Sequence, residues 1–186
     1  LRELIDAFSL EALGKSPSVF NPEKLQWLNA HYIKTEPVEK IVDLLVPYLE
    51  ARQLPSGPRD WLAKIVLAQR ERSKTFVELI DCSMYFLKDE IQYEPSALKK
   101  FHDAENKALL EELLRAMEGL KKFTAETLEE ALNGLAEKRG LKMGKLAQPL
   151  RVAVTGGTVS PGIYDTLAIL GREKTLSRVK GFLSLK

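Results

Sequence analysis

Hydrophobic residues recur along this chain every three or four positions, as they do on one face of an amphipathic helix. Leu25, Leu28 and Tyr32 follow this spacing and predict such an apolar face. Asn21 and Pro22, shortly before them, are typical of an N-cap and of the first turn of a helix. A helix is therefore predicted to begin there.

The same spacing continues after Pro37. An inward-facing set is predicted in this segment: Ile41, Leu44, Leu45, Tyr48 and Leu49. Pro47 is expected to kink or shorten the helix, because proline lacks an amide proton and its ring clashes with the preceding turn. Residues 54–58, Leu-Pro-Ser-Gly-Pro, indicate a linker. Further helices are predicted over residues 61–69, 75–87, 96–120 and 124–140, with Asp60 and Thr124 as N-caps and Gly140 at the end of the last.

The C-terminal part of the chain changes character, with more glycine and proline between its apolar segments. Ser160 and Pro161 are favourable N-cap and first-turn residues for a helix over residues 163–170. Gly171 is expected to end that helix. A final basic helix is predicted to begin near Thr175.

No segment of useful length alternates apolar and polar residues with the period of two that marks a strand, and no repeat is visible. The chain is therefore predicted to be all-α. Its 186 residues suffice for one large domain or two small ones. A boundary is predicted near residues 119–124, between a unit of residues 1–120 and a unit of residues 121–186.

No stretch approaches the roughly 18 apolar residues that span a membrane, so no membrane association is expected. The first residues are amphipathic and acidic, unlike a secretory signal. Because the sequence starts with Leu1 rather than methionine, we expect a fragment or a processed chain. Cys82 is the single cysteine and cannot form an internal disulfide, which is typical of a reducing compartment such as the cytoplasm.

Charge is distributed unevenly along the chain. Residues 138–186 carry ten Lys or Arg and only Asp165 and Glu173 as acids, a net charge of +8. The residues before them carry 18 basic and 24 acidic side chains, a net charge of −6. A cationic end joined to an acidic remainder suits a surface that faces phosphates. From charge alone, uneven surface charge without a partner explains it equally well.

The residue patterns of common active sites are missing from the sequence. His31 and His102 are the only histidines, and neither has a second metal ligand at a suitable spacing. Residues 155–158, Thr-Gly-Gly-Thr, lack the lysine and hydroxyl that complete a phosphate-binding loop, so they predict a turn. Cys82 has no histidine near it in sequence and is expected to pack in the interior. We therefore predict a non-catalytic chain with no metal or cofactor of its own.

Three stretches of the sequence are informative in combination. They are Phe-Asn-Pro-Glu-Lys-Leu-Gln-Trp-Leu-Asn at residues 20–29, Arg-Glu-Arg-Ser-Lys-Thr at residues 70–75, and a longer stretch from Gly144 to Gly171. The third contains Gly-Lys-Leu-Ala-Gln-Pro-Leu-Arg, then Thr-Gly, Ser-Pro-Gly and Leu-Ala-Ile-Leu-Gly, an unusual spacing of proline and glycine. Together they resemble the bacterial glutamyl-tRNA synthetase family over essentially the whole chain.

The resemblance implies a helical anticodon-binding region of such a ligase, a class I aminoacyl-tRNA synthetase. Residues 1–120 would include the end of the stem-contacting region and the first helical anticodon-binding subdomain, and residues 121–186 would be the second. The partner would be tRNA(Glu), bound by a monomer in the cytoplasm. ATP and Mg²⁺ would be bound by a catalytic domain outside this chain.

The resemblance also implies which residues recognise the anticodon. Arg72 matches the family arginine that reads the third base and tends to reject tRNA(Gln), and Arg151 matches an arginine at the first and second bases. Ser160 is expected to bond a base edge, and Pro161 and Ile163 match apolar positions against which a base packs. The residues alone favour another role, in which Ser160 and Pro161 cap a helix and Ile163 is core. The two roles can coexist.

Basic residues are candidates for contacts with RNA phosphates, which add affinity without sequence choice. The candidates are Arg70, Lys142, Lys145, Arg172 and Lys174, with Arg178 and Lys180 near the last two. Trp27 lies between predicted core positions and is expected to pack rather than to stack on a base. The alternative function is a helical protein–protein interaction scaffold whose basic end is incidental, and salt-dependent binding of tRNA distinguishes the two.

Overall fold

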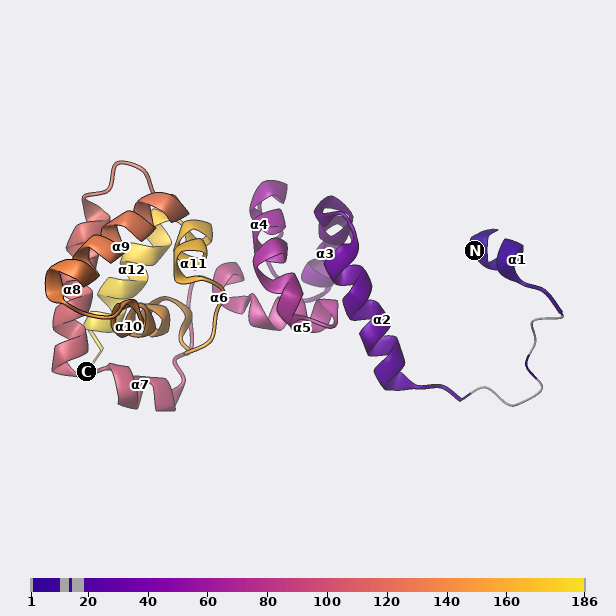
Figure 1. Cartoon of the computed structure of the whole chain (residues 1–186), viewed down its shortest axis with the longest axis horizontal. Coiled ribbons are helices and arrows are strands. Elements are labelled where there is room, and N and C mark those ends of the chain that lie inside the picture. Colours follow the sequence, from indigo (N-terminus) through magenta and orange to yellow (C-terminus); the bar gives the residue numbers. More distant parts are fainter. Residues whose placement is uncertain (1, 11–13, 15–18, 186) are drawn as a thin grey trace.

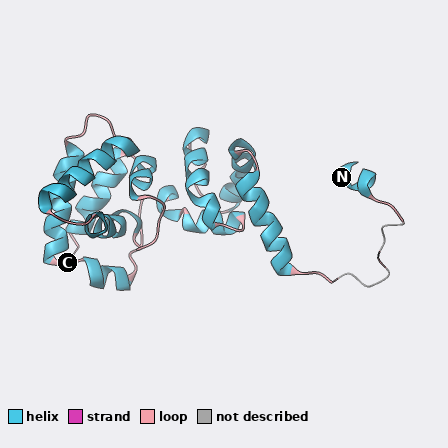
Figure 2. Ribbon diagram, in the orientation of Figure 1, coloured by secondary structure: helices cyan, strands magenta, loops and turns pink. Residues whose placement is uncertain are grey.

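The computed structural model describes residues 2–10, 14 and 19–185 of the chain. All regular secondary structure in these residues is helical, which confirms the predicted fold class (Figure 2). None of the helices in the described ranges is both long and apolar enough to span a membrane. Apart from the short α1 (Arg2–Ala7), the helices form two groups that follow each other along the long axis of the molecule (Figure 1).

The first group contains the helices before residue 88. Its members are α2 (Pro22–Thr35), α3 (Val38–Ala51), α4 (Arg59–Gln69), the 3-10 helix η1 (Arg70–Arg72), α5 (Phe76–Cys82) and α6 (Met84–Leu87). α3 packs against α4 and α5, whereas α2 packs against η1. The short η1 therefore lies where α2, α4 and the start of α5 converge.

The second group contains the helices after residue 94. Its members are α7 (Pro95–Phe101), α8 (Ala104–Glu118), α9 (Ala125–Arg139), α10 (Met143–Thr155), α11 (Ile163–Leu170) and α12 (Arg172–Leu183). α10 packs against each of the other helices of the group, so it is the central one. α11 also packs against α4, and this contact joins the second group to the first.

The subdomain boundary predicted near residues 119–124 falls between α8 and α9, which pack against each other. α8 also packs against α12, which lies after the predicted boundary in the sequence. The two groups in Figure 1 are connected instead by residues 88–94. A division of the chain near residue 120 stays a prediction.

Several helix ends follow the predicted capping residues. The Asn21 side chain accepts a hydrogen bond of 3.1 Å from the amide of the third residue of α2. Thr124 accepts one of 3.4 Å at the same position of α9, and Gly140 ends α9 in the left-handed conformation with a φ of 62°. Asp60 is not a cap, because α4 begins one residue before it.

Two predicted helices are each divided into two. The helix predicted over residues 96–120 breaks before Asp103, whose carboxylate accepts a hydrogen bond of 2.8 Å from an amide in the first turn of α8. The helix predicted over residues 75–87 breaks at Ser83, whose hydroxyl donates to the carbonyl four residues earlier at 2.6 Å. Such side-chain hydrogen bonds compete with continuation of the helix.

The shortening predicted for Pro47 and the predicted start of the last helix are also corrected. Pro47 lies inside α3, which continues to Ala51, so the helix is not shortened, and a kink at Pro47 stays a prediction. α12 begins at Arg172, before the predicted start near Thr175. Gly171 has a φ of 79°, and this conformation ends α11 and starts α12 within one residue.

The end of α10 is in close contact with the connection between the groups. Gly156 has a φ of 85°, and a Cβ atom on it would lie 2.0 Å from the carbonyl oxygen of Gln92. The amide of Glu94 donates a hydrogen bond of 2.8 Å to the carbonyl oxygen of Gly156. Only glycine fits this position, because both the φ and the approach exclude a side chain.

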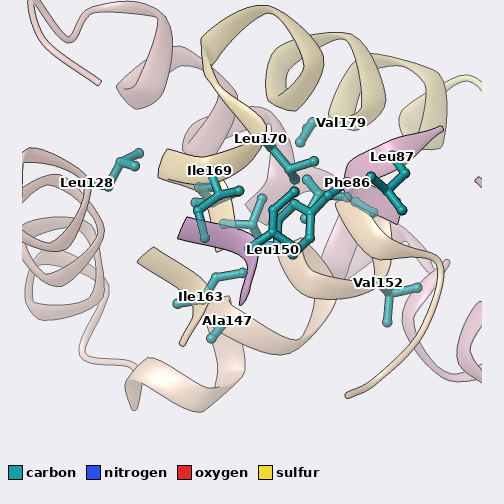
Figure 3. Packing of buried hydrophobic residues seen from close by; sticks show 14 of the residues in the cluster. Phe86, Leu87, Leu128, Ala147, Leu150, Val152, Ile163, Ile169, Leu170 and Val179 are labelled. Carbon is teal, nitrogen blue, oxygen red and sulfur yellow. The ribbon is translucent and has the colours of Figure 1, made fainter. Parts of the chain in front are cut away.

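The buried hydrophobic residues form one cluster that extends over both groups. Phe86 from α6 packs there with Leu150 and Leu170 of the second group (Figure 3). The indole nitrogen of Trp61 on α4 donates a hydrogen bond of 3.0 Å to the carbonyl oxygen of Ile169 on α11. The two groups are therefore held together by apolar packing and by a specific hydrogen bond.

Some residues predicted to face inward are exposed. In α3, Ile41, Leu45 and Leu49 are buried as predicted, but Leu44 and Tyr48 are each 47% exposed. In α2, the predicted apolar face is open to solvent: Leu25 is 53%, Leu28 41% and Tyr32 51% exposed. Trp27 is 65% exposed and is not a core residue of the described part of the chain, and the prediction that it packs rather than stacks on a base stays a prediction.

Candidate nucleic-acid interface

Arg151 holds the loop before α11 in place. Its side chain extends from α10, and Nη1 donates hydrogen bonds of 2.9 Å to the carbonyl oxygens of Ser160 and Pro161. The same nitrogen donates to the Ser160 hydroxyl. Burial lowers the pKa of Arg151, and the positive charge of Arg72 lowers it further. The guanidinium thus fixes the backbone of the loop that the resemblance associates with base contact.

The three residues predicted to act beside Arg151 lie mostly below the surface. Ser160 is 7% and Ile163 6% exposed, Pro161 is also buried, and Ile163 packs in the core (Figure 3). The N-cap of α11 is Gly162, so the prediction that Ser160 caps this helix is wrong. The Ser160 hydroxyl donates instead to the carbonyl oxygen of Pro161 at 2.9 Å. The core position predicted for Ile163 from the residues alone is confirmed.

Arg72 approaches the same loop from the first group of helices. It is the last residue of η1, and its exposed guanidinium forms no hydrogen bond or ion pair with the described residues. A hollow of about 440 Å³, which we call the Arg72–Pro161 hollow, has Arg72 on one wall and Pro161 and Gly162 on the other. The structure thus brings together two segments that the resemblance assigns to different bases.

Arg72 also lines a second hollow of about 530 Å³, between α2 and residues 71–74. Trp27 and Lys34 from α2 form one side of it, and Lys74 lies on the other. The side-chain amide of Asn29 donates a hydrogen bond to the Lys74 carbonyl oxygen, which fastens α2 to this segment. We call this second site the Trp27 hollow.

Gln69 and Tyr85 are two buried or half-buried polar residues that the sequence did not predict, and the charges of both Arg72 and Arg151 act on Tyr85. Gln69 is 2% exposed, and its Nε2 donates to the Tyr85 hydroxyl at 2.7 Å and to the Cys82 carbonyl oxygen at 2.8 Å. Burial raises the pKa of Tyr85, against the opposing positive charges of Arg72 and Arg151. Tyr85 is therefore a neutral hydroxyl. The only sequence signal for this pair is a glutamine at the end of the apolar face of α4.

Most of the C-terminal basic residues bind the protein itself. Nη1 of Arg172 donates to two carbonyl oxygens at the end of α8, at 3.2 and 3.3 Å. Lys174 forms an ion pair of 3.0 Å with Asp89. Arg178 is buried and donates to the carbonyl oxygen of Val154 at 2.6 Å. Much of the positive charge noted in the sequence thus serves to connect helices.

Lys142 and Lys145 differ from these residues. Both are exposed at the start of α10, and their ammonium groups form no hydrogen bond or ion pair with the part of the chain that the structure describes. Arg70, the remaining candidate, is half-buried at the start of η1. The phosphate contacts of all five candidates, Arg172 and Lys174 included, stay predictions.

Comparison with known proteins identifies the class to which this interface belongs. Residues 40–183 match the family model described as "Anticodon binding domain". This match extends from α3 to the end of α12 and includes Arg72, Arg151 and the loop before α11. The chain therefore belongs to this family of anticodon-binding domains.

The most informative relatives are bacterial glutamate–tRNA ligases. The chain is 42% identical over 182 residues to that of Syntrophobacter fumaroxidans, a match that covers 98% of the chain and 39% of the ligase. It is 44% identical to that of Syntrophotalea carbinolica, with the same coverage. A crystal structure of a glutamate tRNA ligase from Elizabethkingia meningosepticum, in complex with its amino acid, matches with a TM-score of 0.87 at 28% identity, over 100% of this chain and 37% of that one. The chain thus spans about two fifths of the length of the ligases that it resembles.

Proposed function

We propose that this chain recognises the anticodon of tRNA(Glu) as part of a glutamate–tRNA ligase. The chain selects and positions the tRNA, while the rest of the ligase binds ATP and Mg²⁺ and transfers glutamate. The protein acts in the cytoplasm as a monomer, and these residues contribute no bond-making group. The observation that carries the proposal is the Arg72–Pro161 hollow, which has a guanidinium with no partner among the described residues opposite a loop fixed by Arg151.

The Arg72–Pro161 hollow offers what an unstacked RNA base requires. An anticodon loop presents the edges and faces of its bases, which are inaccessible in a paired stem. Arg72 supplies a fork of N–H donors that no group of the described protein occupies, and such a fork can form two parallel hydrogen bonds with a base edge. Pro161 supplies an apolar wall, and the Asp165 carboxylate lies beside Gly162, where a Cβ atom would be 2.8 Å from its Oδ2.

Arg151 and its neighbours act mainly by shaping the loop. Nη1 of Arg151 is occupied by Ser160 and Pro161, and its Nε is buried without a partner among the described residues, which leaves the other amino group for a base. The Ser160 hydroxyl donates a hydrogen bond within the loop, to the carbonyl oxygen of Pro161, and Ile163 at the end of the loop is buried in the core. We therefore assign base contact to the backbone of residues 160–162 and to the ring of Pro161, with Ser160 and Ile163 as supports.

Binding of tRNA(Glu) transcripts to the 186-residue chain tests this function. The affinity in a gel-shift titration should fall when an anticodon base is replaced and should weaken steeply as salt is added. A transcript with a changed acceptor stem and an intact anticodon is the matched control and should bind like the parent. Binding that ignores every anticodon position would contradict the proposal. A chain that binds no tRNA but captures a protein partner would support the scaffold function instead.

A further inference from the structure

We infer that the Trp27 hollow binds a second nucleotide of the same RNA, the one next to the base that Arg72 reads, with its base stacked on the Trp27 indole. This inference rests on the proposed function, because it assumes that the Arg72–Pro161 hollow binds the anticodon. It adds a stacking site on α2, and α2 lies before the residues 40–183 that match the family model.

The first support is an exposed aromatic surface inside a hollow large enough for a base. Trp27 is 65% exposed, which leaves a large apolar side chain in water unless a partner covers it. The ring of His31 stacks on the indole, with centroids 5.8 Å apart and planes inclined by 17°. His31 thus supports the orientation of the indole, and the hollow of about 530 Å³ lies beside it. Stacking on aromatic side chains is a common way for proteins to hold unpaired bases.

The second support is the charge of the walls. Five charged residues line the Trp27 hollow: Glu23, Lys34, Glu71, Arg72 and Lys74. Lys34 is paired with Glu71 at 3.4 Å, so these two charges compensate each other. The side chains of Arg72 and Lys74 form no ion pair with the described residues and remain available for a phosphate.

The third support is that the two hollows share a wall. Glu71 and Arg72 line both of them, so the two hollows adjoin at these residues. The wall is also preformed. The Lys74 amide donates a hydrogen bond of 2.7 Å to Glu78, and the Lys74 carbonyl accepts one from Asn29. Little ordering is therefore required of the protein when RNA binds.

A protein occupant is a weaker explanation for this hollow. The apolar residues of α2 that most suit a protein contact are Leu25, Leu28 and Tyr32, and none of them lines the Trp27 hollow. Beside the Lys34–Glu71 pair, the hollow has an aromatic ring, the cations of Arg72 and Lys74 and the single carboxylate of Glu23. This aromatic lining with a net positive charge suits a nucleotide better than an apolar surface. We therefore assign the hollow to RNA.

Tryptophan fluorescence of the 186-residue chain tests the inference, because the chain has two tryptophans in different environments. Trp27 faces the hollow, whereas Trp61 is half-buried with its indole nitrogen bonded to Ile169 at 3.0 Å. An RNA hairpin that carries the anticodon loop of tRNA(Glu) should quench the emission of the wild-type chain. The Trp27→Phe variant retains only Trp61, and its emission should not change on binding.

Affinity for the same hairpin gives an independent measurement. Trp27→Ala should weaken binding roughly tenfold or more, as loss of a stacked base does elsewhere, while Trp27→Phe should retain most of the affinity. Circular dichroism of each variant checks that it is folded. The fluorescence quenching of the wild-type chain tests the inference even if a variant does not fold. Emission that is unchanged while the hairpin binds in an anticodon-dependent way would overturn this inference and leave the proposed function intact. A hairpin that does not bind at all would contradict both.

Discussion

Arg72 and Pro161 line one hollow although 89 positions separate them in the sequence. Arg72 belongs to the first group of helices and Pro161 to the second, so the hollow exists only because the groups pack together. The packing of α4 against α11, with the hydrogen bond between Trp61 and Ile169, holds the two walls in register. Recognition at this hollow therefore depends on the junction between the groups as well as on the residues that face the RNA.

Replacement of Arg72 tests its role as a base reader. In the full-length ligase, Arg72→Gln should lower the preference for tRNA(Glu) over tRNA(Gln), because the forked hydrogen bonds are lost. Such a contact contributes about 1–3 kcal/mol of discrimination, so the ratio of the two kcat/KM values should fall by roughly 5- to 150-fold. Arg59→Gln is the matched control, since Arg59 is exposed and paired with Asp43. A ratio that stays the same in both variants would exclude Arg72 as the reader.

Removal of Arg151 should destabilise the loop before α11. Arg151→Ala leaves the carbonyl oxygens of Ser160 and Pro161 without their donor, which should cost about 1–3 kcal/mol in the free energy of unfolding. Urea denaturation measures this loss. Arg115→Ala removes an exposed arginine whose partner on the same helix is 3.7 Å away, and it should cost less than about 0.5 kcal/mol. Equal losses of unfolding free energy in the two variants would contradict the role of Arg151 in holding the loop before α11 in place.

Two glycines offer a matched pair for testing the contact at the end of α10. Gly156→Ala should destabilise the chain by at least about 1–2 kcal/mol, because of the positive φ and the contact with the Gln92 carbonyl. Gly134 lies in the middle of α9, and a Cβ atom on it would meet nothing within 4 Å, so Gly134→Ala should stabilise the chain by about 0.5–1 kcal/mol. Thermal unfolding of both variants measures the two effects. If the unfolding temperatures of both variants shifted in the same direction, the close contact with Gln92 would not restrict position 156 to glycine.

The sequence predicted those features of the fold that depend on neighbouring residues. The caps at Asn21 and Thr124 and the stop at Gly140 were correct, because each acts through hydrogen bonds or a φ angle within a few residues. The breaks at Asp103 and Ser83 were missed, since both residues also occur inside helices and only their side-chain hydrogen bonds mark the interruption. The hydrophobic periodicity identified the helices, but it did not identify every residue at which a helix begins or ends.

The candidate site could be predicted only in part. Arg72 and the segment around Pro161 were selected by resemblance, but their shared hollow arises from the packing of α4 against α11, which no local pattern encodes. Arg172 and Arg178 were interpreted as a cationic surface, although they donate to carbonyl oxygens at the ends of α8 and α10. Net charge along a sequence does not reveal which carbonyl groups the fold leaves unpaired.

The N-cap of α8 should make stability depend on pH. The Asn106 backbone amide, which donates to the Asp103 carboxylate, lowers the pKa of Asp103 in the folded chain. The Asp103 carboxylate therefore stabilises the folded chain at pH values above the ordinary aspartate pKa of about 4. This stabilisation is lost as the pH falls through the lower pKa of Asp103 in the folded chain. Asn is as good a cap and does not titrate, so the stability of wild type relative to Asp103→Asn should decline in acid. Urea titrations at several pH values measure the difference, and a constant difference would contradict this role.

Exposed lysines at the start of α10 should contribute to the salt dependence of RNA binding. Lys142 and Lys145 are unpaired within the described ranges and lie at the positive end of the α10 dipole, where phosphates are favoured. If each contacts one phosphate, its replacement by Ala should reduce the slope of log K against log salt by about 0.7. Lys180→Ala is the control, because Lys180 is already paired with Glu118 at 2.7 Å and should leave the slope unchanged. The loss of affinity should be similar for every anticodon sequence, because a phosphate carries no sequence information. A slope that falls equally in all three variants would reflect the net charge of the chain rather than contacts at α10.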